Sequence, residues 1–227
     1  MRKVRWFGVT WPLSMFTLAK RLKALPFEDE RTMGFLVDRA SRDSIDGRFF
    51  ERISYSETIR DPRGTEYQFE RVAFNSVEFR CSTSFPQLQV ADAPRSTKSF
   101  MNLLSQSTDF EMTIDALTVD LAKWIKAMEG SFPENFRCDA VRLSEFPVSE
   151  FAKARVEIAS SKDIRGDKYE LLNMETRPFD RAQLRFEYLG APICIVITRD
   201  AVLRSDNEFP PELTSVVRNA FVASWEE

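Results

Sequence analysis

Two stretches of this sequence lie 103 residues apart and resemble each other, which limits the folds that the chain can adopt. Residues 7–25 align without a gap with residues 110–128, and seven of the nineteen aligned positions are identical. Self-similarity at a fixed spacing is the signature of a duplicated structural unit. We therefore predict a tandem duplication, with a first repeat at residues 1–106 and a second at residues 107–227, each of the size of a small domain.

A short motif recurs at nearly the same spacing. Residues 61–67 and 163–169 share the pattern Asp-x-Arg-Gly-x-x-Tyr at an offset of 102 residues. The Asp side chain can accept hydrogen bonds from its own turn, and Gly can adopt the positive φ that a tight turn requires. The pattern therefore favours a turn before a strand. The alternative is a ligand site, in which Arg63 and Arg165 form a pseudosymmetric pair suited to phosphate or carboxylate.

Hydrophobic periodicity predicts the same order of elements in both repeats. Apolar residues at helical spacing predict helices over residues 12–25, 96–104 and 120–130, and a last helix that starts at Pro210. Alternating patterns predict strands at residues 4–11, 33–40, 110–118, 137–143, 151–160, 168–174, 182–189 and 192–199, and a meander from residue 49 to residue 90. The predicted fold class is α+β: a tandem duplication of a β-α-β-β-β-β-α unit, with a largely antiparallel sheet and helices on one face.

This order of elements resembles the TATA-box-binding-protein fold over nearly the whole chain. In that fold, two copies of a strand, helix, four-strand, helix unit join into one curved sheet with helices on its convex side. Sliding-clamp domains, which also repeat β-α-β units, are a second analogue. The resemblance implies a free sheet face, which DNA-binding members of the family line with apolar and cationic groups and with phenylalanine wedges.

Strand alternation predicts a different free face for this chain. The face is expected to be mixed and mildly acidic, so that phosphate repulsion opposes duplex binding across it. Its expected polar residues are Glu66, Gln68, Glu70, Glu78, Arg80, Gln87 and Gln89 in the first repeat, and Glu157, Lys168, Glu170, Gln183, Arg185 and Glu187 in the second.

The sequence contains no histidine, and several kinds of enzyme site therefore lack a required group. Ser-His-Asp catalysis, Cys-His catalysis and histidine–metal chemistry are excluded. Cys81, Cys138 and Cys194 form no CxxC pair, so neither a structural zinc site nor a redox motif is predicted. No Gly-x-Gly or Gly-Lys pair supplies a phosphate-binding loop. We therefore expect no enzyme activity, no cofactor and no metal.

The number and spacing of the cysteines and the length of the apolar runs indicate in which cellular compartment the protein is expected. An odd number of scattered cysteines suits a reducing cytoplasm. The longest apolar run after the N-terminal region, residues 191–197, is far shorter than the roughly 18 residues of a membrane span. We expect a cytoplasmic protein without a membrane span.

The first 27 residues contain six bases and no acid, although the whole chain has a net charge of −3. On a helical wheel, the bases of the first predicted helix lie opposite an apolar stripe of Met15, Leu18, Leu22 and Leu25. Such a face can contact a nucleic-acid backbone, an acidic partner or an anionic membrane, or it can simply be solvated. The candidate binding residues are Arg2, Lys3, Arg5, Lys20, Arg21 and Lys23, together with Arg63 and Arg165.

Phenylalanine outnumbers tyrosine twenty to four. Rings that stack on a ligand are one interpretation, but phenylalanines at apolar strand positions favour the filling of a core between sheet and helices.

These patterns favour a non-catalytic interaction module, a subunit or adaptor of a macromolecular assembly that binds protein partners. One alternative is a nucleic-acid-binding protein that uses the N-terminal basic helix. A further alternative is a metal-dependent hydrolase built only from carboxylates, with candidate acids Asp163, Asp167 and Glu170, or Asp200, Asp206 and Glu208.

Overall fold

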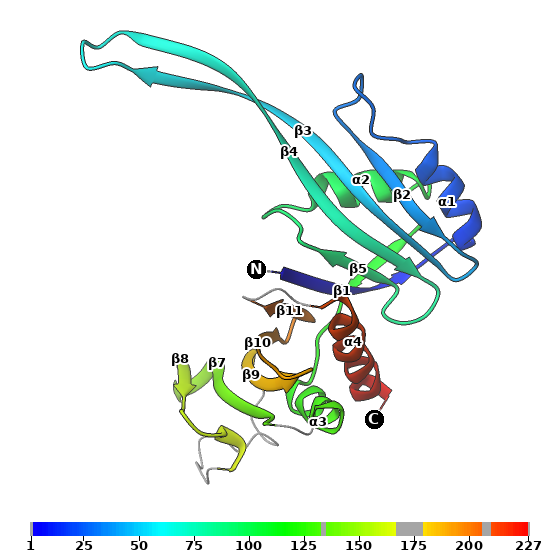
Figure 1. Ribbon diagram of the computed structural model, residues 1–227. Helices are drawn as coiled ribbons and strands as arrows, with labels where there is room; N and C mark the ends of the chain where they lie inside the picture. Colours follow the sequence, from blue (N-terminus) through cyan, green and yellow to red (C-terminus); the bar gives the residue numbers. More distant parts are fainter. Residues whose placement is uncertain (1, 133–134, 167–178, 206–209, 227) are drawn as a thin grey trace. The chain divides into compact units, whose positions relative to one another are not determined.

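The structure is a computed structural model that describes residues 2–132, 135–166, 179–205 and 210–226 (Figure 1). Close contacts divide the chain into two compact units. Unit 1 consists of Met1–Gly8 and Asp115–Glu227, and unit 2 consists of Val9–Ile114. None of the helices in the described ranges has the length and apolar character that a membrane crossing requires.

Unit 2 contains an antiparallel sheet with the strand order β2-β3-β4-β5, and two helices, α1 and α2. Phe100 of α2 is fully buried and packs against Phe35, Phe49 and Phe79 of the sheet, with ring centroids 5.4–6.4 Å apart. These contacts confirm that phenylalanines fill the core here. The elements of unit 2 are α1 (Met15–Lys23), β2 (Met33–Ala40), β3 (Ser44–Arg60), β4 (Glu66–Ser82), β5 (Leu88–Ala91) and α2 (Lys98–Gln106).

Helix α1 begins later than the sequence predicted. Ser14, rather than a residue near Pro12, caps the helix, and its side chain accepts a hydrogen bond from the backbone N–H of Thr17. A Ser at this position satisfies one of the free N–H groups of a first helical turn. The buried residues Met15, Leu18 and Leu22 confirm most of the predicted apolar stripe.

Unit 1 contains an antiparallel sheet with the strand order β1-β11-β10-β9-β7-β8, and helices α3 and α4. Trp6 of β1 stacks on Phe221 of α4 at 5.6 Å and meets Trp124 of α3 edge-on at 5.9 Å, and all three rings are fully buried. The remaining elements are β1 (Arg2–Thr10, shared with unit 2), β6 (Thr113–Ala116), α3 (Leu121–Ser131), β7 (Arg137–Ser149), β8 (Ala152–Ala159), η1 (Ile164–Gly166), β9 (Arg181–Tyr188), β10 (Ala191–Thr198), β11 (Val202–Ser205) and α4 (Pro211–Glu226).

The predicted fold class, a tandem α+β repeat of a β-α-β-β-β-β-α unit, is wrong. Helices and strands are both present, but the structure is mostly antiparallel β-sheet, with 49% of the described residues in strands and 22% in helices. Two features depart from the predicted unit. Strands β3 and β4 are each 17 residues long, and five described strands lie between α3 and α4, whereas the unit has four strands between its helices. The strand predicted at residues 168–174 lies outside the described residues, and β11 was not predicted.

The aligned Leu-Ala-Lys segments occupy different positions in their helices. Leu18 is the fourth residue of α1, whereas Leu121 is the first residue of α3, directly after its cap Asp120. The gap-free alignment therefore does not superpose the two helix starts. The assignment of residues 1–106 to a first repeat and of residues 107–227 to a second, and the resemblance to the TATA-box-binding-protein fold, stay predictions.

Candidate interaction surfaces

The hairpin of β3 and β4 extends past the part of unit 2 that α2 covers (Figure 1). Glu51 marks the end of the covered part, because its Oε1 accepts a hydrogen bond of 2.6 Å from Ser99 of α2. Its Oε2 accepts a hydrogen bond of 3.2 Å from Asn75, which lies opposite on β4. We call the remainder of the hairpin, residues 52–74, the arm.

The two faces of the arm differ in polarity. The register pairs Ile59 with Tyr67 and Tyr55 with Arg71, and residues directly opposite each other share a face. Odd-numbered residues therefore continue the face of the sheet on which Phe49 is buried. We call Ile53, Tyr55, Ile59, Tyr67 and Phe69, which are 38–50% exposed, the apolar face of the arm; Glu57 and Arg71 lie on the same side of the hairpin and form an ion pair with each other. The opposite face is mostly polar and includes Ser54, Ser56, Thr58, Gln68 and Glu70, but near the base of the arm it also carries Val72 and Phe74, which are 56% and 61% exposed.

The first copy of the repeated motif forms the turn at the tip of the arm. Asp61 Oδ1 accepts hydrogen bonds from the backbone N–H groups of Arg63 at 2.9 Å and Thr65 at 2.8 Å. Gly64 has a φ of +89°. Both observations confirm the turn chemistry that was inferred for this copy. The side chain of Arg63 is exposed at this tip.

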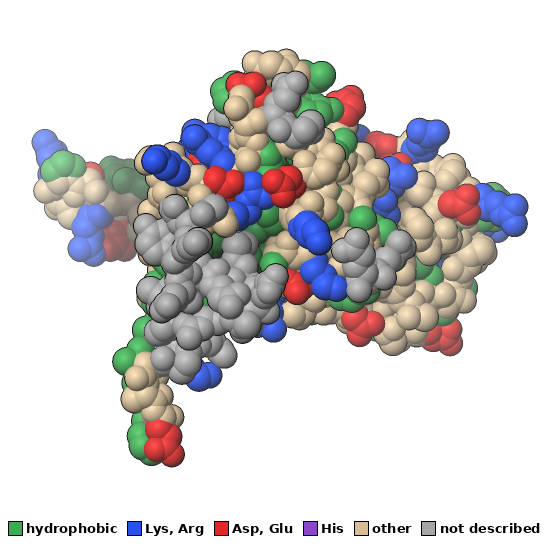
Figure 2. Space-filling view, turned by 90° about the horizontal axis from the view of Figure 1, so that it is seen from below, with side chains coloured by type: hydrophobic (Ala, Val, Ile, Leu, Met, Phe, Trp, Pro, Cys, Tyr) green, Lys and Arg blue, Asp and Glu red, His purple; other side chains and the backbone are tan. Residues whose placement is uncertain are grey.

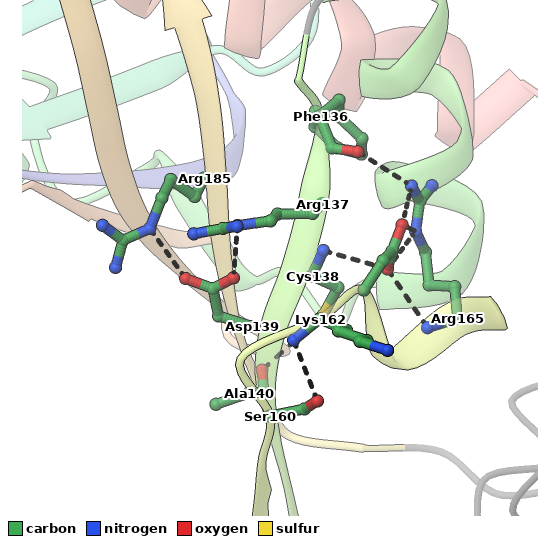
Figure 3. Close-up of polar contacts among 10 residues, drawn as sticks. Phe136, Arg137, Cys138, Asp139, Ala140, Ser160, Lys162, Arg165 and Arg185 are labelled. Atoms are coloured by element: carbon green, nitrogen blue, oxygen red, sulfur yellow. Dashed lines mark hydrogen bonds and ion pairs between the residues drawn. The ribbon is translucent and has the colours of Figure 1, made fainter. Parts of the chain in front are cut away.

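The described part of the second copy, residues 163–166, lies in unit 1, where the side chains of Asp163 and Arg165 are partly buried (Figure 3). Arg165 contacts Asp163 at 2.6 Å through Nη2 and Glu129 of α3 at 2.9 Å through Nη1, and its guanidinium lies 4.9 Å from the centre of the Phe136 ring. Asp163 Oδ1 also accepts a hydrogen bond of 3.2 Å from the N–H of Cys138 in β7. These contacts connect η1, α3 and β7, so Arg165 has a structural role in this unit.

Burial and hydrogen bonding have opposite effects on the pKa of Asp163. Burial opposes ionisation of Asp163, but hydrogen bonds from Arg165 and from the backbone of Arg165 and Cys138 outweigh it and lower the pKa of Asp163. Burial and the nearby Asp163 charge raise the pKa of the Cys138 thiol to about 12. Cys138 is therefore a neutral thiol at physiological pH and is not an activated nucleophile.

The structure separates the six N-terminal bases into two groups. In unit 2, Lys20 and Lys23 are exposed on α1, whereas Arg21 donates to Asp109 at 2.5 Å and to the carbonyl oxygen of Ser107 at 3.1 Å. In unit 1, Arg2, Lys3 and Arg5 belong to β1 and pair in register with β11, so this end of the chain is an ordered strand. Binding by these residues stays a prediction.

The register of unit 1 places many bases on one face of its sheet. Lys3 lies opposite Arg204, Arg137 lies opposite Arg185, and Arg142 lies opposite Arg181. Desolvation and the charges of Arg204 and Arg5 lower the pKa of Lys3. We call this surface the arginine face. Its bases are Lys3, Arg5, Arg137, Arg142, Arg181, Arg185 and Arg204, and its acids include Asp139, Glu157 and Glu187.

The arginine face differs from the mildly acidic face that the sequence predicted. Arg204 was missed because β11 has only four residues and was not predicted, and Lys3 and Arg5 were not assigned to the sheet face. Of the polar residues expected there in the second repeat, Glu157, Gln183, Arg185 and Glu187 are present, whereas Lys168 and Glu170 lie outside the described residues. On the side of the molecule seen in Figure 2, Lys and Arg side chains are interspersed with Asp and Glu.

Asp139 brings two of these arginines together (Figure 3). β7 has a bulge between Cys138 and Ala140, and Asp139 is the extra residue, which a bulge can re-aim. Arg185 Nε donates to Asp139 Oδ2 at 2.8 Å. Arg137 Nε lies 2.9 Å from Oδ1, close enough for an ion pair, although the contact lacks hydrogen-bond geometry. Both arginines lie on the side of β7 away from Arg165.

A pocket of about 350 Å³ adjoins this pair of arginines within unit 1. The pocket lies where β7 begins and where β9 and β10 meet in their hairpin. Its lining residues are Asn135, Phe136, Arg137, Arg185, Phe186, Glu187 and Pro192.

The carboxylate metal site of the hydrolase alternative has no counterpart in the described part of the chain. Within it, no three residues among Cys, Asp and Glu lie close enough together to hold a metal ion. Asp163 is engaged by Arg165, and Asp200 is in a turn; the other candidates, Asp167, Glu170, Asp206 and Glu208, lie outside the described residues.

Comparison of the chain with protein-family models finds no match, and none of the curated proteins matches it in sequence.

Proposed function

We propose that the chain is a non-catalytic interaction module that holds a protein partner through the apolar face of the arm. The observation that carries this proposal is the exposure of Tyr55, Tyr67 and Phe69 on a hairpin that projects from unit 2. Contiguous exposed apolar side chains with a polar surround are typical of protein-binding surfaces.

The energetics of the arm support a bound partner. A two-stranded hairpin is marginally stable by itself in water, because it has no second layer in which to bury its apolar side chains. The arm has two ion pairs, between Arg60 and Glu66 and between Arg71 and Glu57, but exposed ion pairs contribute little. A partner that covers the apolar face supplies the burial that the arm lacks. Tyrosine and phenylalanine are also enriched at the centres of protein interfaces.

Replacing the outer apolar residues should abolish partner binding. We expect the triple variant I59T/Y67S/F69S to lose at least about 100-fold in affinity, because truncated aromatic anchors commonly cost more than about 1 kcal/mol each. The matched control S56A/T58A/Q68A changes the opposite face and should bind as the wild type does. Copurification with the native partner and a titration with that partner measure the effect, and circular dichroism checks that the sheet is retained.

Site-specific cross-linking tests the face directly. A photoreactive amino acid at Phe69 should cross-link the partner, whereas the same group at Gln68, the next residue, should not, because successive residues of a strand point to opposite faces. Equal cross-linking from both positions would contradict the proposal. A cross-link only to a second copy of this chain would also contradict it, because the arm would then be a dimerisation element.

A further inference from the structure

We propose that the pocket beside Arg137 and Arg185 binds a small molecule through a single oxyanion group, a carboxylate or a phosphate. This inference concerns unit 1 and does not depend on the function of the arm in unit 2. It rests on a cavity, on two guanidinium groups at its wall and on the way Asp139 holds them.

The charges of Arg137, Arg185 and Asp139 leave a positive charge at one end of the pocket. The β7–β9 register places Arg137 directly opposite Arg185, and like charges at such positions destabilise a sheet. Asp139 contacts both side chains, but one carboxylate neutralises only one of two guanidinium groups. The trio therefore keeps a net charge of about +1 at the arginine end of the pocket, while Glu187 at the other end brings the lining as a whole to about zero. A bound oxyanion compensates this charge.

Asp139 orients Arg137 and Arg185 before any ligand binds. Both use Nε toward Asp139, and the side chain of Asp139 is only 10% exposed, so the carboxylate is held in place. Arginine presents its N–H groups in a planar fork, and the terminal Nη groups remain to pair with the two oxygens of a carboxylate or with a phosphate. Within the described residues, Arg137 and Arg185 form ion pairs with Asp139 and with no other acidic side chain. Because these side chains are already ordered before a ligand binds, the entropic cost of binding is smaller.

The remaining lining restricts the ligand. A volume of about 350 Å³ lies at the small end of ligand pockets. Glu187 lies on the same strand face as Arg185, two residues along β9, and repels a second anionic group. It favours a hydrogen-bond donor or an ammonium group at that end of the ligand. A long polyanion such as nucleic acid does not fit this pattern, whereas a small molecule with one anionic end and one donor end does.

The test is a titration of the full chain with three probes: inorganic phosphate, acetate and glycine. We expect saturable shifts of backbone NMR signals at residues 135–137 and 185–187, with a dissociation constant in the millimolar range or tighter. Tighter binding of phosphate than of acetate identifies a phosphate ligand. Tighter binding of glycine than of acetate identifies a carboxylate with an ammonium group near Glu187, and E187Q should then remove the difference.

Two variants and one control decide the outcome. R137Q/R185Q should weaken the tightest probe at least about tenfold, which corresponds to roughly 1.4 kcal/mol. R185K keeps the charge beside Asp139 but lacks the fork, so it should also weaken binding even if the double variant folds poorly. R181Q removes a base from the same strand outside the pocket, next to Glu157, and should bind as the wild type does. Unsaturable binding of all three probes, or R185K and R181Q affinities equal to that of the wild type, would overturn the proposal.

Discussion

Replacing Phe100 by alanine should lower the free energy of unfolding of unit 2 by about 3–5 kcal/mol. The ring is completely buried and contacts Phe35, Phe49 and Phe79, so its removal leaves a cavity between α2 and the sheet. Whole domains are commonly stable by only about 5–15 kcal/mol, so this loss is a large share of the total. Urea denaturation followed by circular dichroism, with hydrogen exchange of unit 2 amides, measures the change.

Two further variants keep this prediction testable if F100A does not fold. F100L conserves most of the buried volume and should lose less than about 1.5 kcal/mol. F16A changes a phenylalanine of α1 that is 77% exposed, and its effect should stay within about 0.5 kcal/mol. A loss below 1 kcal/mol for F100A would show that the phenylalanine cluster is not the core of this unit.

Local patterns allowed prediction of the helices. The stripe Leu121, Trp124, Ile125 and Met128 is buried in α3, and Asp120 caps it by accepting hydrogen bonds from Ala122 and Lys123. Capping and 3.6-residue periodicity depend on neighbours within one turn, so a single sequence contains them. The start of α1 was wrong by three residues because both Pro12 and Ser14 can begin a helix.

The arm could not be predicted from the same patterns. Tyr67, Val77 and Phe79 have the spacing of one strand face, but that spacing does not say where the helices stop covering the face. Val77 and Phe79 are buried, whereas Tyr67 is 50% exposed. Whether an apolar strand residue is core or binding surface depends on the length of the hairpin relative to α2, which only the folded structure shows.

The site beside Asp139 could not be predicted from the sequence for a different reason. Arg137 and Arg185 are 48 positions apart, and their pairing follows from the β7–β9 register. The bulge at Asp139 adds one residue to β7 and turns the carboxylate toward both arginines. The sequence does contain part of the pattern, because the spacing of Arg181 and Arg185 places both on one strand face. Strand β7 and its bulge at Asp139 show no sequence pattern that predicts the position of Arg137.

Replacing Asp163 by alanine should destabilise unit 1 by about 2–3 kcal/mol. Breaking a fully buried ion pair costs about 3–5 kcal/mol, and we expect less here because the Asp163 side chain is 33% exposed and Arg165 keeps its contact with Glu129. The N–H groups of Cys138 and Arg165 also lose their acceptor. Urea denaturation at pH 7 measures the loss.

The isosteric variant D163N separates charge from shape through its pH dependence. The pKa of Asp163 is lowered in the folded chain, so ionisation contributes stability above the unfolded pKa of about 3.9. This contribution is lost as the pH falls through the lower folded pKa. The stability difference between the wild type and D163N should therefore be largest near pH 7, shrink below about pH 4 and approach zero at lower pH. A difference that stays constant from pH 7 to pH 2 would contradict the ionic role.

The other copy of the motif is the matched control, because the same sequence pattern lies in a different environment. Asp61 accepts hydrogen bonds from its own turn, but that turn is exposed at the tip of the arm. D61A should therefore cost no more than about 1 kcal/mol, as expected for an exposed turn. If D61A and D163A lost equal stability, the local turn rather than the burial of Arg165 would explain both. A larger loss for D163A means that the motif stabilises unit 1 through its contacts with α3 and β7, which the seven-residue pattern alone does not encode.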